Sequence, residues 1–243
     1  SPFTDSHSAS KIYQVLPYLY GPSYNQTAMI GADCLHNMGF SGQGKIIAVL
    51  DAGFLNVNTL AVFDSLWANG QILGTWDFVN NEASVFEDNA HGTYVLSTMG
   101  GYMSDSLVGT APKASYWLLR TEEVASEYVI EEDNWVAGAE FADSVGADVL
   151  NTSLGYTTFT NSAQDHSYAD MDGNTTRITI GNDIAASKGM FSVCAAGNSG
   201  SSSWFYIGAP ADADSVLAVG AVNATENVSS FSSRGPSYDG RVK

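Results

Sequence analysis

The chain has 243 residues, of which 44% are hydrophobic and 14% charged, a composition that predicts a packed globular protein rather than a disordered one. Its formal net charge is −17, from 26 acidic and 9 basic residues, which excludes nucleic acid as a partner because a phosphate backbone requires clustered Lys and Arg. No run of about 18 or more apolar residues occurs, so we expect no membrane span.

Short apolar runs alternate with helical patterns along the chain. Runs of Val, Ile, Leu and Ala without polar alternation are typical of strands buried on both faces, and they cover residues 46–50, 115–119, 148–150, 191–196 and 216–222. Helices are predicted at 27–38, 92–99, 131–144 and 178–188. This alternation predicts βαβ units and an α/β fold with a mostly parallel sheet flanked by helices. Ligands bind such sheets beyond the carboxyl ends of the strands.

Asp51 directly follows the first apolar run, Ile46 to Leu50. A carboxylate at that position is costly to bury unless it is hydrogen-bonded or paired with a charge. One interpretation is a catalytic or orienting carboxylate. The alternative is a turn aspartate that ends the strand, because Asp-x-Gly is ordinary turn chemistry.

His91 lies at the junction between a loop and the predicted helix 92–99. It is the one histidine of four that has a glycine, Gly92, beside it at such a junction. Glycine allows another backbone or a substrate to approach the imidazole closely. Histidine is the usual general base near neutral pH, and the alternative interpretation is a capping or surface histidine.

Two further motifs follow predicted strands. Asn198 comes after the run 191–196, and its side-chain amide can donate to a developing negative oxygen, an interaction worth about 3 kcal/mol in a transition state. Residues 151–156 follow the run 148–150 and predict an extended edge that can pair with a peptide backbone. The alternatives are an ordinary Asn-Ser-Gly turn and a plain strand that ends in a turn.

Taken together and in this order, the motifs resemble those of the subtilisin-like serine proteases, the subtilases. The resemblance spans roughly Gly42 to Pro236 and rests on Asp51, His91-Gly92-Thr93, Ser153-Leu154-Gly155, Ala196-Gly197-Asn198, Gly109-Thr110-Ala111-Pro112 and Phe231-Ser232-Ser233-Arg234-Gly235-Pro236. The segments 119–123 and 131–135 are similar to those of secreted bacterial subtilases, such as those of the Bacteroidetes. The resemblance implies a subtilisin-like three-layer fold and the hydrolysis of peptide bonds.

The resemblance also implies a role for each motif. Asp51 would orient the imidazole of His91, and His91 would act as general base and then as general acid. Asn198 would donate to the oxyanion. The substrate backbone would lie along Ser153, Leu154 and Gly155, while Ala195, Ala196 and Gly197 would form a wall of the substrate pocket. No residue is assigned as a metal ligand.

The serine expected of this family is missing from the sequence. The family carries it in a Gly-Thr-Ser motif after the segment that corresponds to Phe231–Pro236, and no Gly-Thr-Ser occurs here. We expect a second chain or segment, nicked off or omitted, to supply the serine. The fold would then be incomplete at the C-terminus, and the isolated chain would be inactive and unstable. The alternative is a catalytically inactive peptide-binding or scaffold relative. A nucleotide-binding domain is disfavoured because no Gly-x-Gly-x-x-Gly or Walker pattern follows a strand.

We expect residues 1–40 to be an N-terminal arm and first helix packed on the catalytic domain, and 41–243 to be the N-terminal portion of that domain. No cofactor is required. Calcium has two poorly matched candidates: Asp170–Asn174 lacks the glycine and the closing glutamate of a calcium loop, and 102–108 offers only Asp105. The resemblance implies a polypeptide substrate and a secreted, cell-surface or periplasmic location after removal of a signal peptide and propeptide.

Overall fold

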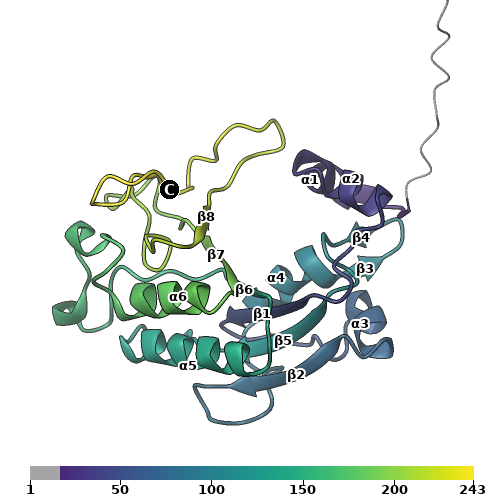
Figure 1. The fold of residues 1–243 in the computed structure, drawn as a ribbon, viewed down its shortest axis with the longest axis horizontal. Coiled ribbons are helices and arrows are strands. Elements are labelled where there is room, and N and C mark those ends of the chain that lie inside the picture. Colours follow the sequence, from purple (N-terminus) through teal and green to yellow (C-terminus); the bar gives the residue numbers. More distant parts are fainter. Residues whose placement is uncertain (1–16) are drawn as a thin grey trace, which may run out of the picture.

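The structure, a computed structural model, describes residues 17–243. A six-stranded sheet forms its centre, with the strand order β2-β5-β1-β6-β7-β8 (Figure 1). The strands are β1 (Ile46–Asp51), β2 (Ile72–Asp77), β5 (Ser115–Arg120), β6 (Val149–Thr152), β7 (Phe191–Ala195) and β8 (Leu217–Val219). Every neighbouring pair in this sheet is parallel. The predicted α/β fold with a mostly parallel sheet is therefore confirmed.

Helices cover the sheet from both sides and form the outer two of three layers. α3 (Asp64–Ala68) and α4 (His91–Gly100) lie on one face, while α5 (Ile130–Ser144) and α6 (Arg177–Ser187) lie side by side on the other (Figure 1). Alternate residues of β1 face the two cores, so that Val49 packs in the core with Leu96 and Leu50 in the core with Trp135. None of the helices described from residue 17 onward has the length and apolar character needed to cross a bilayer.

Shorter elements complete the described chain. They are η1 (Gly21–Ser23), α1 (Tyr24–Met29), α2 (Ala32–Asn37), η2 (Ala61–Phe63), the antiparallel pair β3 (Tyr102–Met103) and β4 (Leu107–Val108), η3 (Ser162–Gln164) and η4 (Tyr168–Asp170). The helix predicted at 27–38 is two helices, because Gly31 between them has a φ of 71° and interrupts the helical path.

The first described residues pack against the β3–β4 hairpin. The Val108 amide donates to Ser23 Oγ at 2.9 Å, and the Asp105 amide donates to the Leu19 carbonyl at 2.7 Å. Behind them, His36 is buried between Tyr20 and the Thr110 carbonyl, at 2.7 and 2.9 Å. A carbonyl only accepts, so Nε2 of His36 carries the proton and Tyr20 donates to Nδ1. His36 is therefore a structural histidine. Residues 1–16 of the expected N-terminal arm lie outside the described residues.

The sheet differs from the prediction at its two edges. β2 was not predicted, because it is a half-buried edge strand that contains Gly74. A Cβ at Gly74 would lie 2.2 Å from the Trp117 ring, so the glycine is needed for packing against β5. At the other edge, the run 216–222 forms only β8, with chain turns on either side of it.

One face of the sheet is covered over only part of its width. Parallel pairing places Val193 of β7 beside Leu217 of β8, and Ala195 beside Val219, on the same face. Leu217 and Val219 are exposed, and so is Phe191 at the start of β7. The opposite face at this point is closed, because Cys194 is buried and accepts a contact from Asn182 of α6. The described chain thus leaves an apolar surface over β7 and β8.

Trp135 links the α5 layer to the sheet and gives a test of this core. Its side chain is 0% exposed, and Nε1 donates to Thr152 Oγ1 at 3.1 Å. We expect Trp135→Ala to lower the free energy of unfolding by about 3–5 kcal/mol, because it leaves a cavity and an unpaired hydroxyl. Ile180→Ala, at an exposed position of α6, should change it by less than about 1 kcal/mol. Urea unfolding of both variants measures the difference, and equal losses would contradict the assignment.

Candidate active site

Asp51 and His91, the two residues expected to form a pair, do so. Asp51 Oδ1 lies 2.7 Å from His91 Nδ1. The Asp51 side chain is 0% exposed, whereas that of His91 is 47% exposed. A buried carboxylate therefore holds one ring nitrogen, and the imidazole reaches the surface of the protein. This arrangement fixes the tautomer that protonates Nδ1 and leaves Nε2 as an acceptor.

Two glycines allow this pair to form. The Gly92 amide donates to the Gly53 carbonyl at 3.0 Å, which places the first turn of α4 against the end of β1. A Cβ at Gly92 would lie 2.6 Å from the Gly53 carbonyl oxygen, and one at Gly53 would lie 2.7 Å from the Asn89 nitrogen. Gly53 also has a φ of 142°, which a side chain would strain. Asn89 accepts the His91 amide at 2.7 Å and so caps the start of the helix.

Arg120 anchors the loop that precedes His91. Its guanidinium is 1% exposed and lies 2.7 Å from Asp77, 3.1 Å from Asp88 and 3.2 Å from Glu123. The network joins the ends of β2 and β5 to the loop just before His91. The carboxylates of Asp88 and Glu123 are partly exposed, whereas that of Asp77 is buried. The contact with Asp77 is therefore the strongest of the three.

The surroundings of Asp51 and His91 raise the pKa of both side chains. The hydrogen bond that His91 donates to Asp51 raises the pKa of His91 above its ordinary value, although partial burial acts in the opposite direction. Burial raises the pKa of Asp51, and the hydrogen bonds from His91 and from the Ala52 amide oppose that shift. The other Asp51 oxygen, Oδ2, is buried and has no hydrogen-bond partner among the described residues.

The remaining predicted residues meet in one pocket of about 220 Å³. Asn198 lines it together with all six residues predicted to bind substrate: Ser153, Leu154, Gly155, Ala195, Ala196 and Gly197. Asn198 is exposed and makes no side-chain hydrogen bond within residues 17–243. Its amide is therefore free to donate to a ligand. These residues come together because β6 and β7 are neighbours and end at the same edge of the sheet, and their roles stay predictions.

The Ser153–Gly155 segment leaves the sheet with its backbone unpaired. β6 ends at Thr152, and the next backbone bonds in the described chain join Tyr156 to Ala209, at 2.8 and 3.3 Å. The intervening amides and carbonyls have no backbone partner among the described residues, so they can pair with an extended peptide. The spacing predicted this segment but not the Tyr156–Ala209 bridge that holds it.

Two serines near the pocket, Ser232 and Ser233, accept hydrogen bonds from backbone amides of the protein. Ser233 is buried, and its Oγ accepts the Ser199 amide at 3.0 Å. Ser232 is also buried, and its Oγ accepts the Ala221 amide at 3.0 Å. The Ser233 hydroxyl lies against Gly197 and the Ser232 hydroxyl against Gly220, and neither makes a hydrogen bond to His91 within the described residues. The sequence context already argued against either serine as the nucleophile, and these bonds agree with that interpretation.

Of the two calcium candidates from the sequence, the segment Asp170–Asn174 uses carboxylate oxygens in hydrogen bonds to nearby residues. Asp170 accepts the Ser167 amide and hydroxyl at 2.7 and 2.8 Å, and Asp172 accepts the Asn174 amide at 2.8 Å. Asp105 lies at the tip of the β3–β4 hairpin with a φ of 60°. A different acidic group, Glu122, Glu127 and Glu131, was missed because its members lie on a loop and a helix start with no regular spacing.

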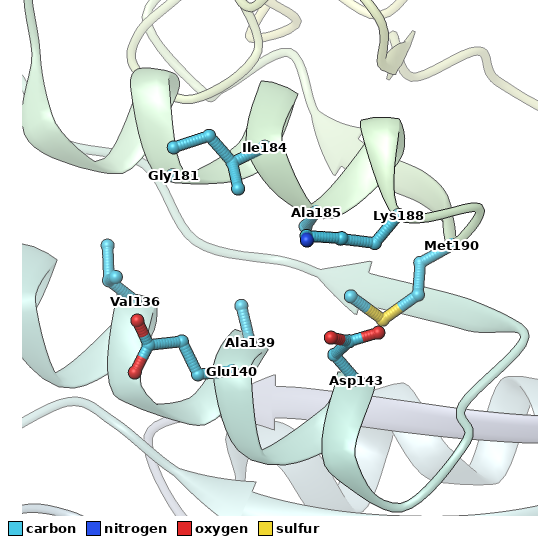
Figure 2. A pocket seen from close by; sticks show the side chains of 9 residues that line it. All are labelled: Val136, Ala139, Glu140, Asp143, Gly181, Ile184, Ala185, Lys188 and Met190. Atoms are coloured by element: carbon cyan, nitrogen blue, oxygen red, sulfur yellow. The ribbon is translucent and has the colours of Figure 1, made fainter.

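A surface groove between α5 and α6 lies apart from these residues. Figure 2 shows Val136 and Glu140 of α5 on one side and Ile184 and Lys188 on the other. None of the predicted site residues lines it. The carboxyl edge of the sheet is therefore the candidate active site.

Comparisons with known proteins agree with this geometry. The model of the subtilase family of peptidases matches residues 42–243. Subtilisin E from Bacillus subtilis is 31% identical over 239 residues, which cover 97% of this chain and 54% of the relative. Thermitase from Thermoactinomyces vulgaris is 31% identical over 204 residues, which cover 82% of this chain and 62% of the relative. The chain thus spans about half the length of the first of these relatives.

Solved structures show the same fold. MycP1 without its N-terminal propeptide aligns with a TM-score of 0.65 at 23% identity, over 88% of this chain and 67% of that one. MycP1 from Mycobacterium smegmatis aligns with a TM-score of 0.63 at 22% identity, over 88% of this chain and 60% of that one. The predicted subtilisin-like arrangement is confirmed, while the narrower likeness to secreted Bacteroidetes proteins stays a prediction.

The shifted titration of His91 can be measured directly. We expect an imidazole pKa above the ordinary value of histidine, and we expect Asp51→Asn to lower it because the stabilising negative charge is removed. In the native protein, the stability that protonation of His91 contributes is then present below the ordinary pKa of histidine and is lost as pH rises through the raised pKa. NMR titration of His91 in both proteins tests this, and an unchanged pKa in the variant would contradict it.

Proposed function

Because the chain belongs to the subtilase family, we propose that the protein it comes from is a serine endopeptidase that cleaves peptide bonds by a Ser-His-Asp mechanism. The observation that carries the proposal is the 2.7 Å contact between Asp51 Oδ1 and His91 Nδ1, with Asp51 buried and the imidazole open to solvent. A buried carboxylate that holds an exposed histidine is the arrangement that activates a serine hydroxyl.

In the proposed reaction, His91 Nε2 takes the proton from the serine hydroxyl as its oxygen attacks the scissile carbonyl carbon. Asp51 stabilises the imidazolium that forms. The carbonyl oxygen becomes negative, and the Asn198 amide donates to it. His91 then gives the proton to the leaving amine, which departs as the acyl-enzyme forms. A water molecule, deprotonated by His91, hydrolyses the acyl-enzyme and regenerates the serine.

We propose that a segment outside these 243 residues supplies the serine. The apolar surface over β7 and β8 supports this, because a pocket of about 290 Å³ on it contains Asn198 together with Val193 and Val219. A helix packed on this surface would bury the exposed side chains of β7 and β8. The first residues of that helix would then lie near Asn198, the proposed oxyanion donor. The absence of Gly-Thr-Ser in the sequence gives independent support. Whether the segment belongs to the same polypeptide or to a second chain is part of the test.

The unpaired backbone of Ser153–Gly155 supports an extended polypeptide as substrate. A peptide that paired with this segment would place a side chain in the pocket lined by Ala195, Ala196 and Gly197. Residues 41–243 would then be the N-terminal portion of the catalytic domain. The likeness to subtilisins supports a secreted location, after removal of a signal peptide and propeptide, and a reaction that needs no cofactor.

The catalytic roles are tested on the full-length protein. We expect a fluorophosphonate probe to label a serine outside residues 1–243, and His91→Ala to abolish labelling and lower kcat by several orders of magnitude. Mass spectrometry of the labelled peptide identifies the serine and the chain that carries it. Labelling that persisted in the variant would contradict the role of His91. A protein that is never labelled and does not cleave casein would instead be an inactive peptide-binding relative.

Asn198 gives a second, separable test. We expect Asn198→Ala to lower kcat about 10²–10³-fold with little change in KM, because the amide acts on charge that develops only in the transition state. Asn174→Ala, at an exposed turn, serves as the matched control and should leave both constants unchanged. Steady-state hydrolysis of a chromogenic peptide measures the effect. A rise in KM without a fall in kcat would show that Asn198 binds substrate rather than the oxyanion.

A further inference from the structure

Three glutamates form a cluster beside the carboxyl end of β5. Glu122 and Glu127 lie on the loop between β5 and α5, and Glu131 lies in the first turn of α5. One carboxylate oxygen from each residue lies within 4.8 Å of the others. The loop and the helix start therefore bring three carboxyl groups into one small volume.

Two of these carboxylates have buried oxygens without a partner. Glu131 is 2% exposed, and its Oε1 accepts the Tyr128 amide at 3.0 Å while its Oε2 has no hydrogen-bond partner. Oε1 of Glu122 is also buried and unpaired. Buried carboxylate oxygens are strong acceptors, and leaving them unsatisfied costs free energy. The described chain therefore provides neither a hydrogen-bond donor nor a cation for these two oxygens.

No basic side chain in residues 17–243 forms an ion pair with the three glutamates. Arg120, at the end of β5, is occupied by Asp77, Asp88 and Glu123. The three carboxyl groups thus lie close together without a basic partner among the described residues, an arrangement that favours a cation.

We propose that Glu122, Glu127 and Glu131 bind a divalent cation, and that the cation is calcium. Carboxylates are hard oxygen ligands, which Ca²⁺ and Mg²⁺ prefer. Ca²⁺ binds oxygen at about 2.3–2.6 Å, so two of its ligands can lie up to about 5 Å apart, whereas the limit for Mg²⁺ is about 4.2 Å. The three oxygens lie within 4.8 Å of one another, a limit that Ca²⁺ accommodates over its whole range. Water and backbone carbonyls would complete its coordination.

The position of this site predicts what the cation would do. The backbone of Glu127 is tied to Thr160, by contacts of 2.7 and 3.1 Å, and Glu127 shares a pocket with Gly155. The residue before Glu122, Thr121, donates its amide to the Asp51 carbonyl at 3.0 Å. A bound ion would thus fix the 122–131 loop between the end of β1 and the segment proposed to bind substrate. The site differs from both calcium candidates that the sequence suggested.

Calcium binding by the purified full-length protein tests the proposal without relying on activity. After treatment with a chelator and buffer exchange, equilibrium dialysis with ⁴⁵Ca²⁺ should show one more bound ion in the native protein than in Glu131→Gln. Glu127→Gln, which is less buried, should weaken the same site by about tenfold or more. Glu140→Gln removes the same charge from an exposed position of α5 and should leave the stoichiometry and Kd unchanged.

Thermal unfolding gives a second readout that separates a ligand site from a simple structural role. In chelator, Glu131→Gln should unfold at the same temperature as the native protein or higher, because one repelling charge is gone. With added calcium, the native protein should gain more in Tm than this variant does. Equal calcium binding and equal Tm gains in the two proteins would overturn the proposal. A second result would also overturn the proposal: the cluster binds no calcium, and its variants lose only the cleavage of peptides that contain Lys or Arg. The cluster would then be a subsite for a basic side chain of the substrate.

Discussion

The close contact between the end of β1 and the start of α4 is the constraint on which the site depends. Gly53 and Gly92 have no Cβ, so the two backbones meet through a 3.0 Å hydrogen bond, and Asp51 and His91 are brought into register. The carboxylate is desolvated at the end of a buried strand, while the imidazole stays at the surface. The cost of burying Asp51 is offset by hydrogen bonds from His91 and Ala52.

The same edge of the sheet organises everything else that bears on function. β6 and β7 lie next to β1 and end beside it, so the Ser153–Gly155 segment and the Ala195–Asn198 turn border one pocket. Ser233 closes the pocket from beneath, through its contact with the Ser199 amide. The open apolar face over β7 and β8 lies next to this pocket, on the face of the sheet opposite to α6, because Cys194 is already buried on the α6 side. The candidate active site and the open apolar surface therefore lie at the same edge of the sheet.

Much of this could be predicted from the sequence, for physical reasons that also explain the omissions. Strands such as Ile46–Asp51 are recognisable because both faces are buried and the run is uniformly apolar. β2 was not predicted because an edge strand with Gly74 has no such run. The break at Gly31 was not predicted because the helical pattern of the sequence continues across it. The candidate site residues could be selected from the sequence because they follow predicted strands, and their roles stay predictions. The Glu122–Glu131 cluster was not, since its proximity depends on the path of a loop.

The buried network of Arg120 has a consequence for behaviour on heating. The hydration of charged groups becomes less favourable as temperature rises, so the penalty for desolvating Arg120 and Asp77 falls. The ion pairs of Arg120 contribute little to the free energy of unfolding near 25 °C. They contribute more at higher temperature, where the hydrophobic contribution per unit of buried area no longer increases. The loop that ends in Asp88, just before His91, is held by this guanidinium. His91 would therefore keep its position up to temperatures close to that at which the surrounding core unfolds. On heating, its contact with Asp51 would be lost in global unfolding rather than through early loosening of this loop.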